Sequence, residues 1–202
     1  MKGLLLKDWY LTKKYAMRLL VIALVFMVIS PIWPENGFFM IYPCVLFCLL
    51  PTTLYSYDEK EKWTIYAESM PVSRALYVTE KYLVGVIVMA AYFLLLTLLY
   101  LFFGAREYLP DALISSVALG FLAPAVMLPI LLRFGTEKGR LAYLIFIGVI
   151  FGGTLILTGG GKGELDMPRL GSLPEWCLAL FPLLLYILSW RLSVALYKKR
   201  EL

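Results

Sequence analysis

Residues 82–103 read YLVGVIVMAAYFLLLTLLYLFF, a long apolar run without a charged side chain. A helix needs about 20 such residues to cross the hydrocarbon core of a bilayer. Similar runs recur along the chain, separated by segments that hold most of the charged residues. We therefore expect an all-α integral membrane protein with six transmembrane helices. The five other runs cover residues 17–33, 38–55, 113–132, 141–157 and 176–190.

The composition of the 202 residues supports this fold class. Hydrophobic residues make up 61% of the chain and charged residues 16%, whereas ordinary globular domains have about 45–50% and about 25%. The chain has no histidine, which excludes histidine-based catalysis and removes the commonest metal ligand. We expect no catalytic, cofactor-binding or metal site in this chain. We interpret Cys44, Cys48 and Cys177 as apolar packing residues.

The distribution of positive charge predicts the orientation. Of the 19 lysines and arginines, all but Arg106, Lys162 and Arg169 lie before or at the start of the first run, or after the second, fourth and sixth. Positive residues near helix ends are retained in the cytoplasm. We therefore expect a multi-pass protein with both termini in the cytoplasm, and we attribute the net charge of +5 to this placement and not to a nucleic-acid partner.

The chain is expected to form one transmembrane domain over residues 1–202. Lys7, Lys14 and Arg18 fall on one side of a helical wheel, which is typical of a helix that lies in the membrane interface. The expected parts are an elbow helix (1–16), helices 1 and 2 (17–55), a cytoplasmic coupling loop (56–81), helices 3 to 6 (82–192) and a cytoplasmic tail (193–202).

The loop after the second run carries signals of a short helix. Ser56, followed three residues later by Glu59, resembles a capping box, and Pro71 would end the helix. Its aromatic face would hold Trp63, Tyr66 and Met70. Such a face suits either docking to a partner or contact with the lipid interface. Beyond it, Ser73 can cap a new helix that runs directly into the third span.

Prolines and glycines within the runs predict kinks and close contacts. Gly148 and Gly152, four positions apart, would let another helix approach closely. No charge lies deep in a run, which argues against an ion-driven pump. Residues 159–163 (GGGKG) lack the spacing of a nucleotide-binding loop, so these patterns leave the energy source unexplained. Prolines inside the runs are expected to kink their helices. The kinks either line a transport path or reflect only that proline is commoner in membrane helices. These prolines include Pro43, Pro51, Pro124 and Pro129.

Several short motifs together resemble a known family. They are residues 1–8 (MKGLLLKD), 56–60 (SYDEK) with 62–63 (KW), 71–74 (PVSR) with 81–82 (KY), and 133–135 (RFG) with 137–140 (EKGR). The combination extends over nearly the whole chain and resembles small bacterial permeases of the ABC-2 type. It is most similar to the short permeases that include the membrane subunits of phenol-soluble modulin exporters.

The resemblance implies that two permease copies pair and that two cytoplasmic ABC ATPase subunits dock beneath them. ATP and Mg would bind to those ATPases, so this chain would be a transport subunit in the bacterial plasma membrane and not an enzyme. Helix 58–69 would be the coupling helix and loop 133–140 a lesser contact, while Gly148 and Gly152 would pack the dimer. The implied ATPase contacts are Asp58, Glu59, Lys60, Lys62, Trp63, Tyr66, Arg133, Glu137 and Lys138.

The expected function is export of amphipathic or hydrophobic peptides, in contact with membrane lipids. Lipids or hydrophobic drugs would suit an apolar path equally well. An alternative is the substrate-binding membrane component of a vitamin importer, but its Ala-x-x-x-Ala signature is missing because Ala16 and Ala23 are seven positions apart. A structural or immunity protein without transport is a further alternative, and a neighbouring ATPase gene would discriminate against it.

Overall fold

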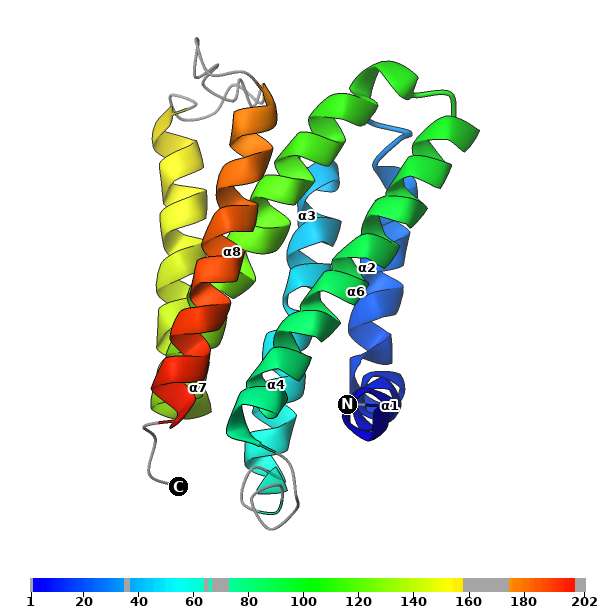
Figure 1. Cartoon of the computed structure of the whole chain (residues 1–202). Coiled ribbons are helices and arrows are strands. Elements are labelled where there is room, and N and C mark those ends of the chain that lie inside the picture. Colours follow the sequence, from blue (N-terminus) through cyan, green and yellow to red (C-terminus); the bar gives the residue numbers. More distant parts are fainter. Residues whose placement is uncertain (1, 35–36, 64–65, 67–72, 158–174, 199–202) are drawn as a thin grey trace.

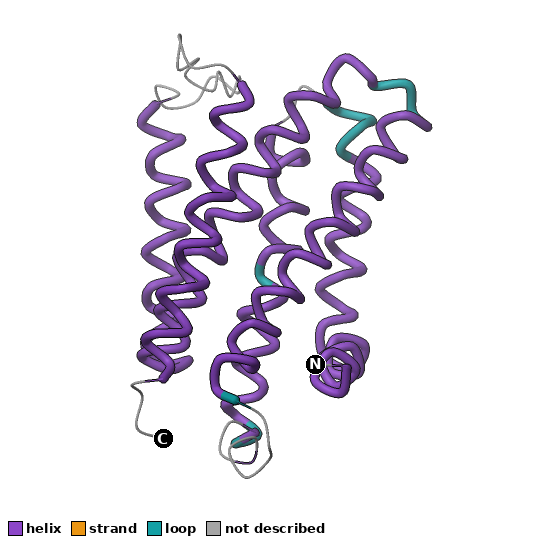
Figure 2. Tube along the Cα trace, in the orientation of Figure 1, coloured by secondary structure: helices purple, strands orange, loops and turns teal. Residues whose placement is uncertain are grey.

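The computed structural model describes residues 2–34, 37–63, 66, 73–157 and 175–198. Every element in these ranges is helical, with short connections between helices (Figure 2). Apart from the first helix, they run along a shared long direction (Figure 1). In chain order they are α1 (Lys2–Leu11), the π-helical turn η1 (Thr12–Ala16), α2 (Met17–Ile29), α3 (Gly37–Cys48), α4 (Leu50–Lys60), α6 (Arg74–Phe102), the 3-10 turn η2 (Arg106–Tyr108), α7 (Leu109–Leu157) and α8 (Glu175–Lys198).

The first helix leaves the bundle at a steep angle, since Figure 1 shows α1 nearly end-on while α2 runs lengthwise. On α1, Trp9 and Tyr10 are exposed, whereas Asp8 is buried and Lys7 is mostly covered. Lys14 and Arg18, which share its side of the helical wheel, are exposed, but the Lys7 side chain is only 17% exposed. The reason is that its partner lies on another helix, which a helical wheel of one segment does not contain. The position of α1 at a membrane interface stays a prediction.

The second predicted span is not one helix. α3 ends at Cys48 and α4 begins at Leu50, with Pro51 in the first turn of α4, where the missing proline N–H costs no hydrogen bond. α4 continues to Lys60, so Ser56 lies inside it and donates a hydrogen bond to the Thr52 carbonyl at 2.9 Å. The predicted cap at Ser56, and the start of a separate helix near Asp58, are therefore wrong.

The predicted start of the third span is confirmed. The Ser73 hydroxyl accepts a hydrogen bond from the Leu76 backbone N–H at 3.2 Å, and Ser73 itself is extended with φ −70° and ψ 145°. Its side chain satisfies one of the unpaired N–H groups at the helix end. The resulting helix, α6, runs without interruption for 29 residues.

α7 contains the fourth and fifth predicted spans, joined at a sharp kink. Gly135 has φ 80° and ψ 178° there, a left-handed conformation that glycine adopts without steric cost. α8 follows as the last helix, and its C-terminal end lies at the same end of the bundle as α1 (Figure 1).

Three helical stretches among the described residues are long and apolar enough to cross a membrane. α2 and α3 have 13 and 12 residues, fewer than the about 20 that hydrocarbon requires, so the count of six crossings stays a prediction. The three qualifying stretches are Arg74–Phe102, Arg106–Thr136 and Leu180–Tyr197.

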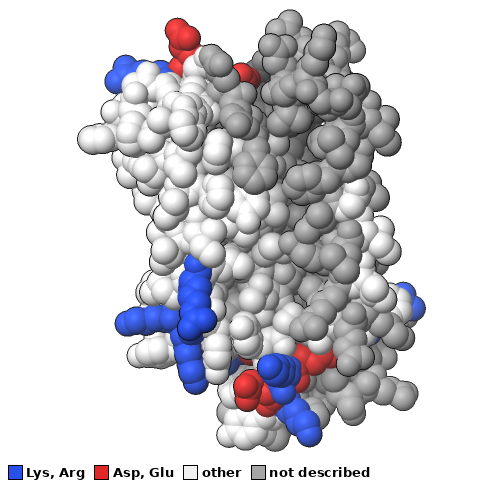
Figure 3. Space-filling model, turned by 180° about the vertical axis from the view of Figure 1, so that it is seen from behind, with Lys and Arg blue, Asp and Glu red and all other residues white. Residues whose placement is uncertain are grey.

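The outward surface of these helices is apolar. On α8, Leu184, Leu188 and Leu192 are each more than half exposed at a spacing of one helical turn. On the face shown in Figure 3, charged atoms lie toward the two ends and the described surface between them is uncharged. Large contiguous apolar surface of this kind is typical of contact with lipid.

Buried hydroxyl groups fix α6 to α8. The Tyr82 hydroxyl lies 2.7 Å from the hydroxyls of both Ser189 and Ser193, and Tyr186 donates to the Tyr82 carbonyl at 2.8 Å. Hydrogen bonds between helices hold membrane bundles together where lipid offers no polar partner. These hydrogen bonds attach α8 to the N-terminal part of α6, around Tyr82. The charge distribution predicts that this part of α6 faces the cytoplasm.

Candidate functional site

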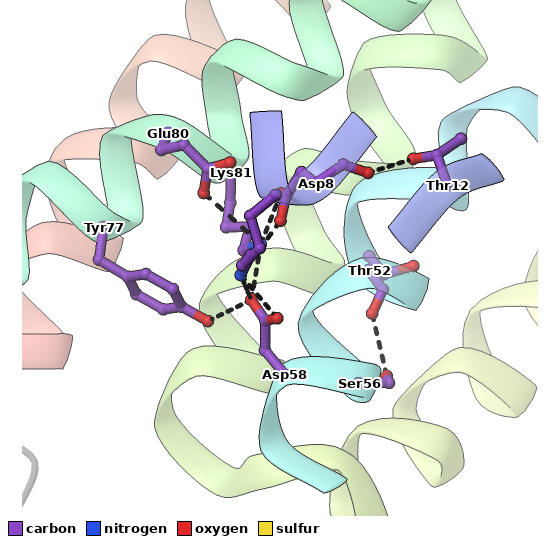
Figure 4. Close-up of polar contacts among 9 residues, drawn as sticks. Asp8, Thr12, Thr52, Ser56, Asp58, Tyr77, Glu80 and Lys81 are labelled. Carbon is purple, nitrogen blue, oxygen red and sulfur yellow. Dashed lines mark hydrogen bonds and ion pairs between the residues drawn. The ribbon is translucent and has the colours of Figure 1, made fainter. Parts of the chain in front are cut away.

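Five ionisable side chains from three helices are joined by ion pairs, and Figure 4 labels four of them: Asp8, Asp58, Glu80 and Lys81. We call the five side chains the charge cluster. Lys7 and Asp8 come from α1, Asp58 from the last turn of α4, and Glu80 and Lys81 from the start of α6.

Two lysines bridge the carboxylates of the charge cluster. Lys81 Nζ lies 2.6 Å from Oδ2 of Asp8 and 2.8 Å from Oδ2 of Asp58. Lys7 Nζ lies 2.7 Å from both carboxylate oxygens of Asp58 and 3.2 Å from Oδ1 of Asp8. The cluster therefore joins α1, α4 and α6 through alternating positive and negative charges.

α6, which is capped by Ser73, brings two side chains to this cluster. Tyr77 and Lys81 are four positions apart in the helix, so they lie one turn apart on the same face. The Tyr77 hydroxyl donates to Oδ2 of Asp58 at 2.9 Å, beside the Lys81 contact. Asp58 thus has three partners, which a buried carboxylate needs to offset its loss of water.

The cluster is almost completely withdrawn from solvent. The side chains of Asp8 and Asp58 are 2% exposed, and those of Glu80 and Lys81 are 0% exposed. Burial alone would raise the pKa of Asp8, but the charge of Lys81, a hydrogen bond with Glu80 and the charge of Lys7 together lower that pKa below its usual value. Asp8 is therefore held as a carboxylate.

An aromatic pair lies beside the cluster. Lys7 Nζ lies 4.8 Å from the centre of the Trp63 ring, a cation–π distance. Trp63 contacts Tyr66 with ring centroids 5.4 Å apart, and Tyr66 is 56% exposed. A surface residue is thereby connected, through Trp63 and Lys7, to the buried carboxylate of Asp58.

The two loops predicted to face a partner touch each other. Oε2 of Glu59, near the end of α4, accepts a hydrogen bond from the Thr136 backbone N–H at 2.6 Å. A Cβ added at Gly135 would lie 2.8 Å from Oε1 of Glu59. Glycine is therefore required here for two reasons: its positive φ, and the lack of room for a side chain beside Glu59. The end of α4 and the kink of α7 therefore form one continuous structure.

The other predicted contact residues differ in what the structure describes. Lys60, Lys62 and Arg133 are exposed, and Lys62 has φ 55° just beyond the end of α4. Met70 and the side chains of Glu137 and Lys138 lie outside the described residues.

The predicted packing residues lie away from the charge cluster. Pro43, Pro51, Pro124 and Pro129 are all buried, and their role in lining a path stays a prediction. A Cβ at Gly148 would meet nothing within 4 Å, so this face of α7 is open within the chain. The surroundings of Gly152 lie outside the described part of α7.

Cys44 and Cys48 are buried free thiols, as expected of packing residues, and the side chain of Cys177 is not described. Cys44 donates to the Ser116 carbonyl at 3.3 Å. Within the described residues, no group of three or more Cys, Asp or Glu side chains is arranged to hold a metal ion.

Sequence reasoning missed most of the charge cluster. It selected Asp58 but not Lys7, Asp8, Glu80 or Lys81 as site residues. One feature of the sequence could have indicated the cluster: residues of opposite charge stand next to long apolar segments. Asp8 precedes the first of these segments, and the pair Glu80-Lys81 precedes the third. Their pairing could not be read from spacing, because the partners lie far apart in the chain.

The all-helical fold, the apolar outer surface and the charges gathered at helix ends define an integral membrane protein. Residues 3–198 match the family described as ABC-2 family transporter protein, and the chain belongs to that family. It is thus a membrane permease subunit of an ABC transporter, a class that works with an ABC ATPase. No curated protein and no solved structure is significantly similar to the chain.

Proposed function

We propose that this permease exports amphipathic or hydrophobic peptides from a bacterial cell, driven by a separate ATPase. Two permease copies would pair and two ATPase subunits would dock on their cytoplasmic side. The observation that carries the docking proposal is the Glu59–Thr136 contact, which unites two loops into one surface. Both loops carry motifs on which the resemblance to small ABC-2 permeases rests.

The geometry offers a direct route from a docked ATPase to the membrane helices. Trp63 and Tyr66 would receive the partner, with Lys60, Lys62 and Arg133 at the exposed rim. Displacement of Trp63 would move Lys7 and the buried Asp58. Since Asp58 is bound to Tyr77 and Lys81 on α6, the 29-residue helix would carry that movement into the bilayer.

Membrane placement follows from the same proposal. The excess of lysine and arginine near the predicted inner loops supports cytoplasmic termini, and α1 lies at the same end of the bundle as the C-terminal end of α8 (Figure 1). The open face at Gly148 supports close approach of a second permease copy along α7.

The substrate class is proposed from the resemblance to modulin exporters and from the apolar character of the spans. An uncharged path would suit a peptide with one hydrophobic face. Lipids and hydrophobic drugs share that property, so they form the comparison in the test.

The test uses the full permease co-expressed with its partner ABC ATPase, which is sought first among the products of the neighbouring genes. Trp63→Ala should leave the permease in the membrane but reduce the amount of ATPase that co-purifies. Trp33→Ala is the control for loss of an indole ring, because Trp33 is an exposed tryptophan beyond the C-terminal end of α2. Equal co-purification in wild type and Trp63→Ala would refute the docking surface.

The substrate is tested by ATPase activity of the reconstituted complex with amphipathic peptides, lipids and dyes. Stimulation by peptides above that by lipids or dyes is the expected result. Stimulation by lipids or dyes alone would reassign the substrate while leaving the docking surface intact.

A further inference from the structure

Glu80 is the member of the charge cluster whose burial the ion pairs do not explain. Its side chain is 0% exposed, and neither carboxyl oxygen has a hydrogen-bond donor. Figure 4 shows it directed toward Lys81, whose Nζ lies 3.5 Å from Oε2. That distance is long compared with the 2.6 Å and 2.8 Å contacts that Lys81 makes to Asp8 and Asp58.

The charges of the cluster balance without Glu80. Lys7 and Lys81 supply two positive charges, and Asp8 and Asp58 supply two negative charges at hydrogen-bonding distance. An ionised Glu80 would add a third negative charge at a site closed to bulk solvent. Burying an ion without its own partner is among the most unfavourable changes in a protein interior.

A third oxygen without a hydrogen bond lies in the same cluster. Oδ1 of Asp8 is buried and accepts no hydrogen bond, because Lys81 donates to the other oxygen and Lys7, whose Nζ lies 3.2 Å away, donates to Asp58. Asp8 and Glu80 lie on the same ammonium group, with Lys81 Nζ 2.6 Å from Oδ2 of Asp8 and 3.5 Å from Oε2 of Glu80, and a hydrogen bond with Glu80 helps to lower the pKa of Asp8. Two ionised carboxylates that share one cation at a buried site repel each other, whereas one proton between them allows a strong hydrogen bond.

We propose that Glu80 is a proton-binding site: its carboxyl group carries a proton at neutral pH and donates it to Oδ1 of Asp8. This assignment pairs Oδ1 of Asp8 with one of the two Glu80 oxygens, and it makes the cluster electrically neutral. It also places a titratable bond between α1 and α6. The proposal is independent of substrate and of ATPase docking.

The groups around the proton come from every helix at this junction. α1 contributes Lys7 and Asp8, α4 contributes Asp58, and α6 itself contributes Tyr77 and Lys81. Tyr197 of α8 contacts Tyr77, with ring centroids 5.7 Å apart. Loss of the proton would leave three carboxylates facing two lysines, so the hold of α1 on α6 would weaken.

The sign of the pH dependence follows from proton linkage. A carboxyl group that is protonated in the folded protein but ionised in the unfolded chain takes up a proton on folding. Stability therefore falls as the pH rises from mildly acidic to mildly alkaline values. Asp8 works in the opposite direction, because its lowered pKa causes loss of stability only in acid.

The direct test is infrared spectroscopy of the full chain in lipid nanodiscs. Wild type should show the carbonyl stretch of a protonated carboxylic acid at neutral pH, and the band should disappear on alkaline titration. Glu80→Gln should lack that band, and Asp8→Asn should shift its frequency by changing the acceptor. Absence of the band from the wild type would overturn the proposal, whether or not the variants fold.

The second test is the melting temperature as a function of pH. Glu80→Gln keeps a hydrogen-bond donor toward Asp8, so it should melt close to wild type at neutral pH and lose the decline on the alkaline side. Glu107→Gln, at an exposed glutamate in η2, is the matched control and should behave as wild type. A Glu80→Gln protein with the wild-type pH profile would show that Glu80 carries no such proton.

Discussion

Lys81 and Asp8 are 73 positions apart in the chain, yet their side chains form a buried ion pair with Nζ 2.6 Å from Oδ2. The pair joins the helix that precedes the first span to the helix that forms the third. Lys81 also contacts Asp58 at 2.8 Å, so a single ammonium group holds together the parts of the chain through which an ATPase would act.

Removal of the Lys81 ammonium should strongly destabilise the protein. Lys81→Met leaves Asp8 and Asp58 buried with too little positive charge, and breaking a buried pair in this way costs about 3–5 kcal/mol. Thermal unfolding of the purified protein measures the loss. Lys60→Met, at an exposed lysine on α4, should have little effect.

The same experiment has an internal check. Adding Asp8→Asn to Lys81→Met removes one of the unpaired carboxylates and should recover part of the lost stability. The free energy of unfolding that Asp8→Asn removes from wild type is compared with the amount it removes from Lys81→Met. Equal losses in the two backgrounds would show that the two side chains are not coupled as the structure indicates.

The Tyr77 hydroxyl should contribute through its bond to Asp58. Tyr77→Phe removes the 2.9 Å hydrogen bond but keeps the ring and its contact with Tyr197. Hydrogen bonds to charged groups contribute about 1.5–3 kcal/mol, so the melting temperature should fall clearly. Tyr10→Phe, on the exposed side of α1, serves as control, and equal melting of the two variants would contradict the buried bond.

Gly135 should be far less tolerant of alanine than Gly104. Both have positive φ, 80° and 76°, so both alanine variants lose about 1–2 kcal/mol from backbone strain. Only at Gly135 would the added Cβ also meet the carboxylate of Glu59, because Gly104 has open space around it. Gly135→Ala should therefore melt at the lower temperature.

Glu59→Ala separates the two causes. In that background the excess effect of Gly135→Ala over Gly104→Ala should shrink, since the clash is gone and strain alone remains. An excess that persists unchanged would show that the Glu59–Thr136 contact does not shape the kink of α7.

Much of the architecture was predictable because it depends on local chemistry. Residues 82–103 form part of a long helix because an apolar segment must satisfy its own backbone hydrogen bonds in lipid, and Ser73 marks the helix start because its hydroxyl caps a nearby N–H. The prediction failed at Ser56, where a capping pattern lies inside a helix. α4 already begins at Leu50, with Pro51 in its first turn, and a helix that is already propagating has no free N–H for Ser56 to cap.

The sequence alone determined that this chain is a helical membrane protein, since composition and the length of its apolar runs are properties of the chain. Only the tertiary structure decided that Lys7, Asp8, Asp58, Glu80 and Lys81 form one cluster. Their attraction depends on distance and burial, and it becomes strong only when packing of α1, α4 and α6 removes water from between them. No local pattern encodes that removal of water, so the charge cluster had to be found in three dimensions.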